Sequence, residues 1–156
     1  MKYSLLLVLI VFTSCNGQKK ATVADNDSKS DLDANTSLTL LLQDNYSGSD
    51  TSETMVVKDS KTLKGFFSKI NRTRKPGLPV PEVDFSKDMV IIYCEGLRND
   101  SGFSGLSLKV ETKDRLVFKP TYQAPQEKSN FTAAISPFCV YKIPLTDKEI
   151  TIAPVK

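Results

Sequence analysis

Residues 88–95 read DMVIIYCE, an apolar run between two acidic residues. A strand with one solvent-exposed face alternates apolar and polar side chains, whereas this segment does not alternate. Such a pattern is typical of a strand whose two faces are both buried. We therefore expect residues 88–95 to be the central strand of a sheet.

Shorter strand signals lie on both sides of this segment. Residues 106–110 alternate Leu or Val with polar side chains, and the turn at residues 112–114 (TKD) leads into a partner strand at residues 115–119. Four more strands are expected at residues 37–46, 53–58, 138–143 and 149–152.

One helix is expected after the second strand. Asp59 or Ser60 can cap its start, and an apolar stripe follows at helical spacing: Leu63, Phe66, Phe67 and Ile70. The fold class is therefore α+β: a single small, antiparallel, β-rich domain of about six to seven strands with one main helix.

The first fifteen residues have the layout of an export signal. Lys2 supplies a positive start, residues 5–12 (LLLVLIVF) are apolar, and Thr13 and Ser14 are small residues just before Cys15. A membrane span needs about 20 apolar residues, so this run is too short to cross a bilayer. The pattern predicts a bacterial lipoprotein, cut before Cys15 and acylated there with chains such as palmitate; a soluble secreted protein with a free Cys15 is the alternative.

The segment after Cys15 is too polar to fold alone. Residues 16–35 are nearly free of large apolar side chains, which is typical of a flexible tether. We expect a signal peptide at residues 1–14, the lipidated cysteine and tether at residues 15–36, and the folded domain at residues 37–156. The residue after Cys15 is Asn16, whereas the resemblance among lipoproteins retained in the inner membrane includes an Asp at this position. We therefore expect the outer membrane. The sequence does not decide between its periplasmic side and its surface side.

Composition narrows the chemistry. The chain has no histidine, the commonest general base and metal ligand, and its 21 basic and 18 acidic residues are too balanced to indicate a nucleic-acid partner. Phosphate-binding glycine motifs and closely spaced cysteines are absent from the sequence, so no cofactor and no metal are expected. Glu82, Asp84 and Asp88 lie close in sequence, which leaves a carboxylate-only hydrolase as a weak alternative.

Two cysteines remain beside Cys15. Cys94 and Cys139 both lie in expected strands that can be neighbours, and export brings them into an oxidising compartment where a disulfide can form. Their apolar surroundings favour buried free thiols instead.

A loop rich in turn formers joins the most buried strand to the hairpin. Its residues are Arg98, Asn99, Asp100, Ser101, Gly102 and Phe103. Arg and aromatic residues are enriched at interface hot spots, so Phe103 pointing outward would anchor a partner. The other interpretation is that Phe103 packs under the loop as a core residue.

Several short motifs, in this order, resemble the C-terminal domain of the protease complex subunit PrcB family. They are Tyr46-Ser47-Gly48, Met55 to Asp59, Val83-Asp84-Phe85, Ser101-Gly102-Phe103, Ser136-Pro137-Phe138 and Ile143-Pro144. The chain departs from the family at the glycine loop, which has one Gly before the aromatic residue instead of two. The resemblance implies a noncatalytic subunit that helps a secreted protease to form a stable, active complex.

The expected function is thus that of a lipid-anchored interaction module of the cell envelope, with a secreted protease or another envelope protein as its partner. We expect the loop from Arg98 to Phe103, joined by Ser136, Pro137 and Phe138, to form the binding surface. A protease inhibitor is the alternative, because a Gly-aromatic loop on a small β domain can enter an active-site cleft.

Overall fold

The computed structural model describes residues 36–99, 102–123 and 133–154. The chain divides into two units, Met1–Ser30 and Asp31–Lys156, and all described residues belong to the second. The expected signal peptide, Cys15, most of the tether, and the loop residues Asp100 and Ser101 lie outside the described residues.

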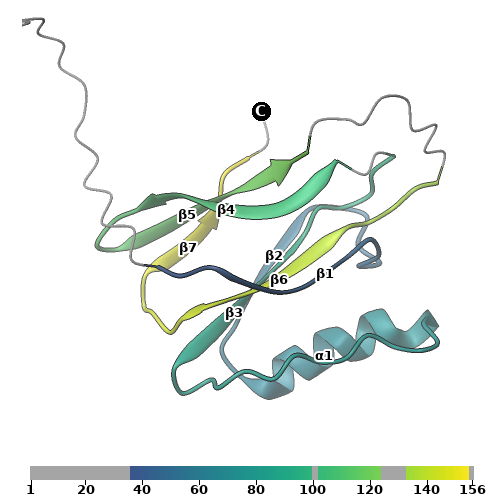
Figure 1. Ribbon diagram of the computed structural model, residues 1–156, viewed down its shortest axis with the longest axis horizontal. Coiled ribbons are helices and arrows are strands. Elements are labelled where there is room, and N and C mark those ends of the chain that lie inside the picture. Colours follow the sequence, from purple (N-terminus) through teal and green to yellow (C-terminus); the bar gives the residue numbers. More distant parts are fainter. Residues whose placement is uncertain (1–35, 100–101, 124–132, 155–156) are drawn as a thin grey trace, which may run out of the picture. The chain divides into compact units, whose positions relative to one another are not determined.

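A four-stranded antiparallel sheet forms the middle of this unit (Figure 1). In sheet order its strands are β1 (Thr39–Asp44), β6 (Phe138–Pro144), β3 (Asp88–Cys94) and β2 (Glu53–Val57). Ile92 of β3 pairs with Val140 of β6 on one side and with Met55 of β2 on the other. The prediction of a central strand at residues 88–95 is confirmed.

Three strands form a second sheet. They are, in sheet order, β4 (Phe103–Glu111), β5 (Arg115–Tyr122) and β7 (Glu149–Ile152). β4 and β5 form the expected antiparallel hairpin, but β7 runs parallel to β5. The predicted fold class, a small β-rich α+β domain with one main helix, is confirmed, and the β5–β7 pair is the one described strand pair that departs from the expected antiparallel arrangement. Parallel neighbours need a crossover connection, and the chain makes it by passing through β6 in the other sheet before it returns as β7.

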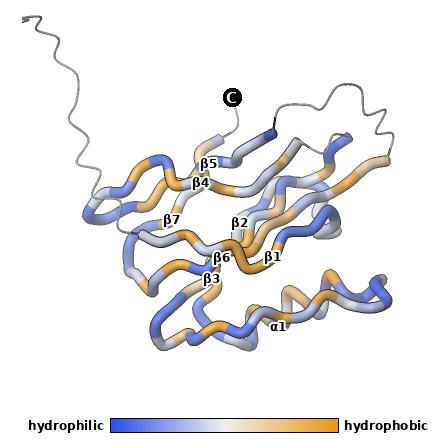
Figure 2. Tube along the Cα trace, in the orientation of Figure 1, coloured by the Kyte–Doolittle hydropathy of each residue, from blue (hydrophilic) through white to orange (hydrophobic). Residues whose placement is uncertain are grey.

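β3 supplies side chains to two separate cores. Val90, Ile92 and Cys94 pack toward the helix α1, whereas Met89, Ile91 and Tyr93 pack toward the three-stranded sheet. The unit therefore has three layers, helix, four-stranded sheet and three-stranded sheet, and Figure 2 shows apolar residues running along the middle strands. Apolar residues on both faces of β3 are thus explained by burial on both faces.

The helix α1 (Ser60–Ile70) continues into a short 3-10 turn at Asn71–Thr73. Asp59 is its N-cap, because a carboxylate oxygen of Asp59 accepts a hydrogen bond of 2.8 Å from the backbone N–H of Thr62. The predicted stripe of Leu63, Phe66, Phe67 and Ile70 is buried against the four-stranded sheet, so the helix prediction is confirmed. In the part of the chain that the structure describes, no helix is long and apolar enough to cross a membrane.

Candidate functional site

A cleft of about 450 Å³ opens beside the C-terminal ends of β3 and β7. It is lined by Ser52, Thr54, Tyr93, Glu95, Ile152, Ala153 and Pro154. One wall therefore comes from β2 and the residue before it, the floor from β3, and the other wall from the end of β7.

Glu95 at the floor is the most unusual residue of the cleft, because it is an acid whose side chain is only 3% exposed. It directly follows β3, and its backbone N–H still donates to the carbonyl of Pro137 at 2.9 Å. Alternation along the strand places Glu95 on the same face as Tyr93, toward the three-stranded sheet. The position of Glu95 at the end of a buried, apolar strand thus places its carboxylate in the interior.

Three donors compensate the burial of this carboxylate. Oε1 of Glu95 accepts from the Arg98 guanidinium at 3.0 Å and from the Tyr122 hydroxyl at 2.5 Å. Oε2 accepts from the Tyr93 hydroxyl at 2.8 Å. A buried charge is tolerated only when it is paired and hydrogen-bonded, and here both conditions are met. We call Glu95, Arg98, Tyr93 and Tyr122 the Glu95 cluster.

The surroundings hold these partners in place. The Ser52 hydroxyl donates to the Tyr93 hydroxyl at 3.2 Å, and the Arg98 guanidinium lies 5.5 Å from the centre of the Tyr122 ring. Gly96 turns the chain after Glu95 with a φ of +86°, and a Cβ there would lie 2.8 Å from the carbonyl carbon of Thr51. Glycine is needed at this turn for both reasons, and the turn brings Arg98 back over Glu95.

Both tyrosines of the cluster are donors at neutral pH. Burial, aided by the nearby Glu95 carboxylate, raises the pKa of Tyr93 to about 12, although the Ser52 hydrogen bond opposes the shift. Burial and the hydrogen bond to Glu95 likewise raise the pKa of Tyr122. Hydroxyls with such pKa values stay protonated, so the arrangement stabilises a carboxylate and does not supply a general base from tyrosine.

The structure corrects four residues of the expected binding surface. Phe103, Ser136, Pro137 and Phe138 are all buried, so their side chains cannot contact a partner. Phe103 packs in the core between the two sheets, with ring centres 5.8 Å from Tyr93 and 6.1 Å from Tyr122.

Ser136 and Phe138 have equally clear structural roles. The Ser136 hydroxyl accepts hydrogen bonds from the backbone N–H groups of Ser47 and Gly48 at 3.2 and 3.1 Å. Phe138 packs with its ring centre 5.5 Å from that of Phe66 in the helix-side core. The three residues 136–138, which were expected at the surface, therefore pack in the core and hold the neighbouring loop by hydrogen bonds.

The remaining loop residues lie nearer the surface. Asn99 is exposed, Gly102 is partly exposed, and Arg98 is half-buried. The backbone of Arg98 also pairs with that of Ile135. The Ile135 N–H donates to the Arg98 carbonyl at 2.8 Å, and the Arg98 N–H donates to the Ile135 carbonyl at 2.7 Å. Among the described residues of the expected surface, Arg98 is the one whose side chain donates a hydrogen bond to Glu95.

Cys94 and Cys139 lie on adjacent strands but on opposite faces of the sheet. Tyr93 is opposite Cys139 in the register of β3 and β6, and the two thiols belong to different cores. Both cysteines are free in the structure. Burial raises the pKa of Cys94 to about 11 and raises that of Cys139 as well, so neither thiol is a ready nucleophile.

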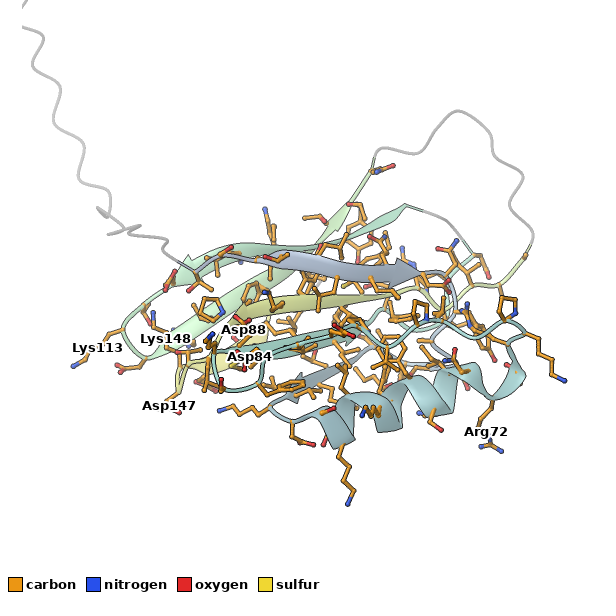
Figure 3. The ribbon with its side chains drawn as sticks, turned by 60° about the horizontal axis from the view of Figure 1, so that its bottom comes forward. Arg72, Asp84, Asp88, Lys113, Asp147 and Lys148 are labelled. Atoms are coloured by element: carbon orange, nitrogen blue, oxygen red, sulfur yellow. The ribbon has the colours of Figure 1, made fainter. Side chains whose placement is uncertain are left out.

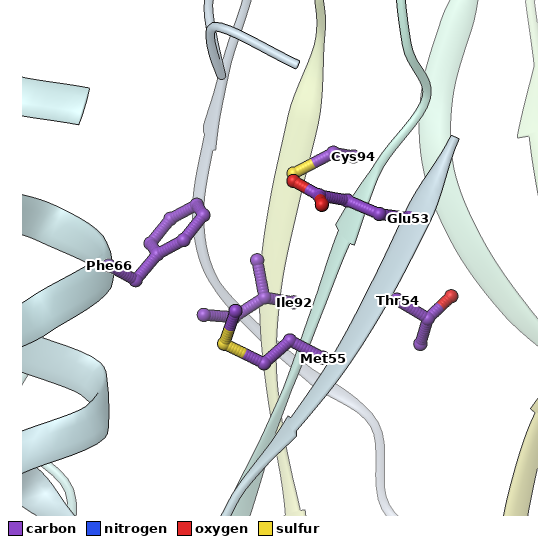
Figure 4. Close-up of a pocket in the computed structure, with 6 residues that line it drawn as sticks. All are labelled: Glu53, Thr54, Met55, Phe66, Ile92 and Cys94. Atoms are coloured by element: carbon purple, nitrogen blue, oxygen red, sulfur yellow. The ribbon is translucent and has the colours of Figure 1, made fainter. Parts of the chain in front are cut away.

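A small cavity of about 20 Å³ lies between β2 and α1 (Figure 4). Glu53, Thr54, Met55, Phe66, Ile92 and Cys94 line it. This volume is enough for about one water molecule and too small for a substrate. We assign it no catalytic role.

The three carboxylates that could serve a hydrolase do not line this cleft: Glu82 is exposed, and Asp84 and Asp88, both labelled in Figure 3, are paired with lysines. Asp84 lies 3.3 Å from the ammonium of Lys87, and Asp88 lies 3.2 Å from that of Lys142. Within the described ranges, no group of three His, Cys, Asp or Glu side chains is placed to hold a metal ion.

Figure 3 also labels residues of a hollow of about 310 Å³ at the other end of the strands. Lys113, Asp114, Thr146, Asp147 and Lys148 line it. The Lys148 ammonium lies 2.7 Å from the Glu111 carboxylate, so acids and bases compensate each other there.

Sequence reasoning found Arg98 but missed Glu95 as a site residue. The available signal was an acid that ends the most apolar strand and is followed by glycine. No family model matches this chain, and neither a curated protein nor a solved structure matches it.

Proposed function

We propose that this protein is a noncatalytic, lipid-anchored binding module of the bacterial cell envelope that contacts a partner protein through the cleft around Glu95. The observation that carries the proposal is the buried Glu95 at the floor of an open cleft, where it is paired with the half-buried Arg98 and accepts hydrogen bonds from two tyrosine hydroxyls. A polar cluster held together by several hydrogen bonds is rigid, and preorganised Arg and Tyr side chains are the types that dominate binding interfaces.

The chemistry of the cleft supports binding over catalysis. The raised pKa values of Tyr93 and Tyr122 keep both hydroxyls protonated at neutral pH. The Glu95 carboxylate already accepts three hydrogen bonds, one of them from a guanidinium. The two tyrosines and Arg98 are therefore arranged to donate hydrogen bonds to Glu95 and not to take a proton from a substrate.

The proposed anchor is the acyl group on Cys15, and it has a direct test. Cys15→Ser should abolish acyl labelling of the protein and leave an unprocessed or soluble form. The measurement is incorporation of a palmitate analogue, followed by membrane fractionation with a carbonate wash. A variant that stays fully in the washed membrane fraction would refute the anchor.

The proposed partner class is a secreted protease, which rests on the resemblance to the PrcB family. The full lipidated protein should be cross-linked in intact cells, purified, and assayed for proteolysis. A co-purifying active protease supports the accessory role, a silenced protease supports the inhibitor alternative, and turnover of a glycan supports the carboxylate-only hydrolase.

Arg98→Ala tests whether the Glu95 cluster, which supplies the floor of the cleft through Glu95 and Tyr93, is the contact surface. The matched control is Arg72→Ala, because Arg72 is an exposed arginine of the 3-10 turn that follows α1. We expect Arg98→Ala to reduce partner capture by about tenfold or more and Arg72→Ala to leave it unchanged. Thermal unfolding of each variant verifies that the domain is folded; equal capture by both folded variants would place the interface elsewhere.

A further inference from the structure

We infer that the cleft accepts an extended segment of the partner protein, which pairs with the free edge of β7 as a fourth strand and lies over β2. The inference rests on the proposed binding role and specifies what is bound. It follows from the unequal width of the two sheets, from the edge of β7 that no described strand pairs with, and from the charges along the outer face of β2.

The edge strands of the two sheets lie beside each other at one side of the molecule. At the other side, the four-stranded sheet extends one strand beyond the three-stranded sheet. The Gln43 side chain of β1 donates to the carbonyl of Phe103 in β4 at 3.4 Å, and the Thr36 hydroxyl donates to the Glu111 carboxylate at 2.8 Å. β4 therefore lies beside β1. At the other side, β7 packs through Ile150 and Ile152 onto the core face of β3.

β2 is consequently the strand that no strand of the described second sheet covers. Its residues alternate, and Met55 and Val57 face the helix-side core. Thr54 and Val56 point to the opposite face, where Thr54 is exposed and Val56 is 39% exposed. A fourth strand beside β7 would lie above these two residues, since stacked sheets are about 10 Å apart.

No described strand pairs with the outer edge of β7, and the backbone groups of that edge point in the right direction. The N–H of Glu149 donates to Asp114 at 2.9 Å, and the N–H of Ala153 donates to Phe118 at 2.7 Å, so these groups point toward β5. Backbone groups alternate in direction along a strand, and those of Ile150 and Ile152 therefore point away from β5. An extended peptide can add to such an edge with main-chain hydrogen bonds.

The other side of the molecule is protected against strand addition. The pairing of β1 is interrupted between Leu40 and Leu42, and that of β4 is interrupted between Phe103 and Gly105 and again near Val110. Bulges of this kind twist an edge and hinder pairing. The registers of β2 with β3 and of β7 with β5 are continuous, so the regular edges are those beside the cleft.

Charge along the outer face of β2 and the residues that flank it specifies the segment further. Ser52, Thr54, Val56 and Lys58 alternate along one face, over roughly 20 Å for six steps of about 3.3 Å. Glu95 lies at the Ser52 end, whereas the Lys58 ammonium lies 3.5 Å from the carbonyl of Thr146, just before β7. The complementary segment carries a cationic residue at one end, an anionic residue at the other and apolar residues between them.

The Glu95 carboxylate, which lines the cleft, keeps one acceptor site that no described residue uses. It accepts three hydrogen bonds, and a carboxylate can accept about four. The partner's ammonium or guanidinium can therefore join the existing bonds without displacing Arg98.

A second copy of this chain fits the edge poorly. Two copies joined antiparallel through β7 are related by a twofold axis perpendicular to the three-stranded sheet. Both four-stranded sheets would then lie on the same side, and β2 of each copy would overlap β3 of the other. A single extended segment avoids this overlap.

The test uses capped peptides of about eight residues in which Val and Thr alternate, with Lys and Glu at the two ends in either order or with neutral ends. Backbone amide signals of the full mature protein are followed by NMR during titration to about 1 mM peptide. We expect the signals of Ile150 and Ile152 to shift, and one order of the charged ends to bind best.

Three variants complete the test. Val56→Lys should weaken binding by about tenfold or more, whereas its control Leu40→Lys, at a residue 48% exposed on the opposite edge strand, should not change it. Lys58→Glu should reverse the preferred charge at its end of the peptide. The amide spectrum verifies the fold of each variant.

Four results would overturn the inference: no binding across the peptide set, shifts confined to β1 or β4, equal losses in Val56→Lys and Leu40→Lys, or a dimer by sedimentation that Val56→Lys dissociates. Failure of the peptides to bind, with partner capture still lost in Arg98→Ala, would leave the proposed function standing and remove strand addition alone.

Discussion

Truncation of Glu95 should show how much the Glu95 cluster contributes to folding. In Glu95→Ala, the Tyr93, Tyr122 and Arg98 side chains each lose an acceptor. The loss is most severe for Tyr93, which is buried. The remaining hydrogen bond of its hydroxyl is one that it accepts from Ser52, so its own proton loses its acceptor. Arg98, 32% exposed, and Tyr122, 37% exposed, can turn to water instead.

The magnitude follows from these exposures. A buried donor left without an acceptor costs about 1–3 kcal/mol, and each half-exposed donor loses about 1 kcal/mol. The total of about 3–5 kcal/mol agrees with the usual cost of breaking a buried ion pair. Glu95→Gln keeps one carbonyl acceptor and loses the charge, so we expect a smaller cost of about 1.5–3 kcal/mol.

The assay is urea unfolding followed by circular dichroism, with the slope m compared between variants. The control is Glu82→Ala, which removes an exposed carboxylate of the loop before β3 and should change the free energy of unfolding by less than about 0.5 kcal/mol. In the Glu95→Ala background, Arg98→Ala should cost less than it does alone, because the two residues are coupled. Equal destabilisation by Glu95→Ala and Glu82→Ala, or full additivity with Arg98→Ala, would show that the cluster is not an energetic unit.

Three further predictions concern the buried core. Phe103→Ala should reduce the free energy of unfolding by about 3–5 kcal/mol in the same urea assay, because Phe103 is a core aromatic residue. A change below about 0.5 kcal/mol would show that the Phe103 side chain is not buried in the core. Cys94 and Cys139 should both react with a thiol reagent in denatured, unreduced protein and react slowly in the native state; fewer than two reactive groups after denaturation would contradict the free thiols. Because the folded-state pKa of Tyr93 is raised from 10.0 to about 12, the stability it contributes is complete below about pH 10 and is lost as the pH rises to 12. The difference in tyrosinate absorbance between the protein and Tyr93→Phe isolates this group, and its ionisation near pH 10 without unfolding would argue against the prediction.

The sequence alone determined the elements whose pattern is local. The apolar run at residues 88–95 predicted a central strand, and the spacing of Leu63, Phe66, Phe67 and Ile70 predicted the helix and its buried face. Both patterns report burial at neighbouring positions of one element, which local periodicity encodes. Boundaries were less accurate: β4 begins at Phe103 and not at residue 106, because its first residues are held by pairing with the far end of β5.

The tertiary structure alone decided which of these elements meet. Two orientations of Phe103 were open from the sequence, and the rings of Tyr93 and Tyr122 settle the inward one. Glu95 looks like an ordinary acid at the end of a strand, and its burial depends on Tyr122, a residue 27 positions away, as well as on the turn at Gly96. The parallel pairing of β7 with β5 likewise arises from a crossover through the other sheet. Contacts between distant segments depend on how complementary faces pack together, and no local period in the sequence records that choice.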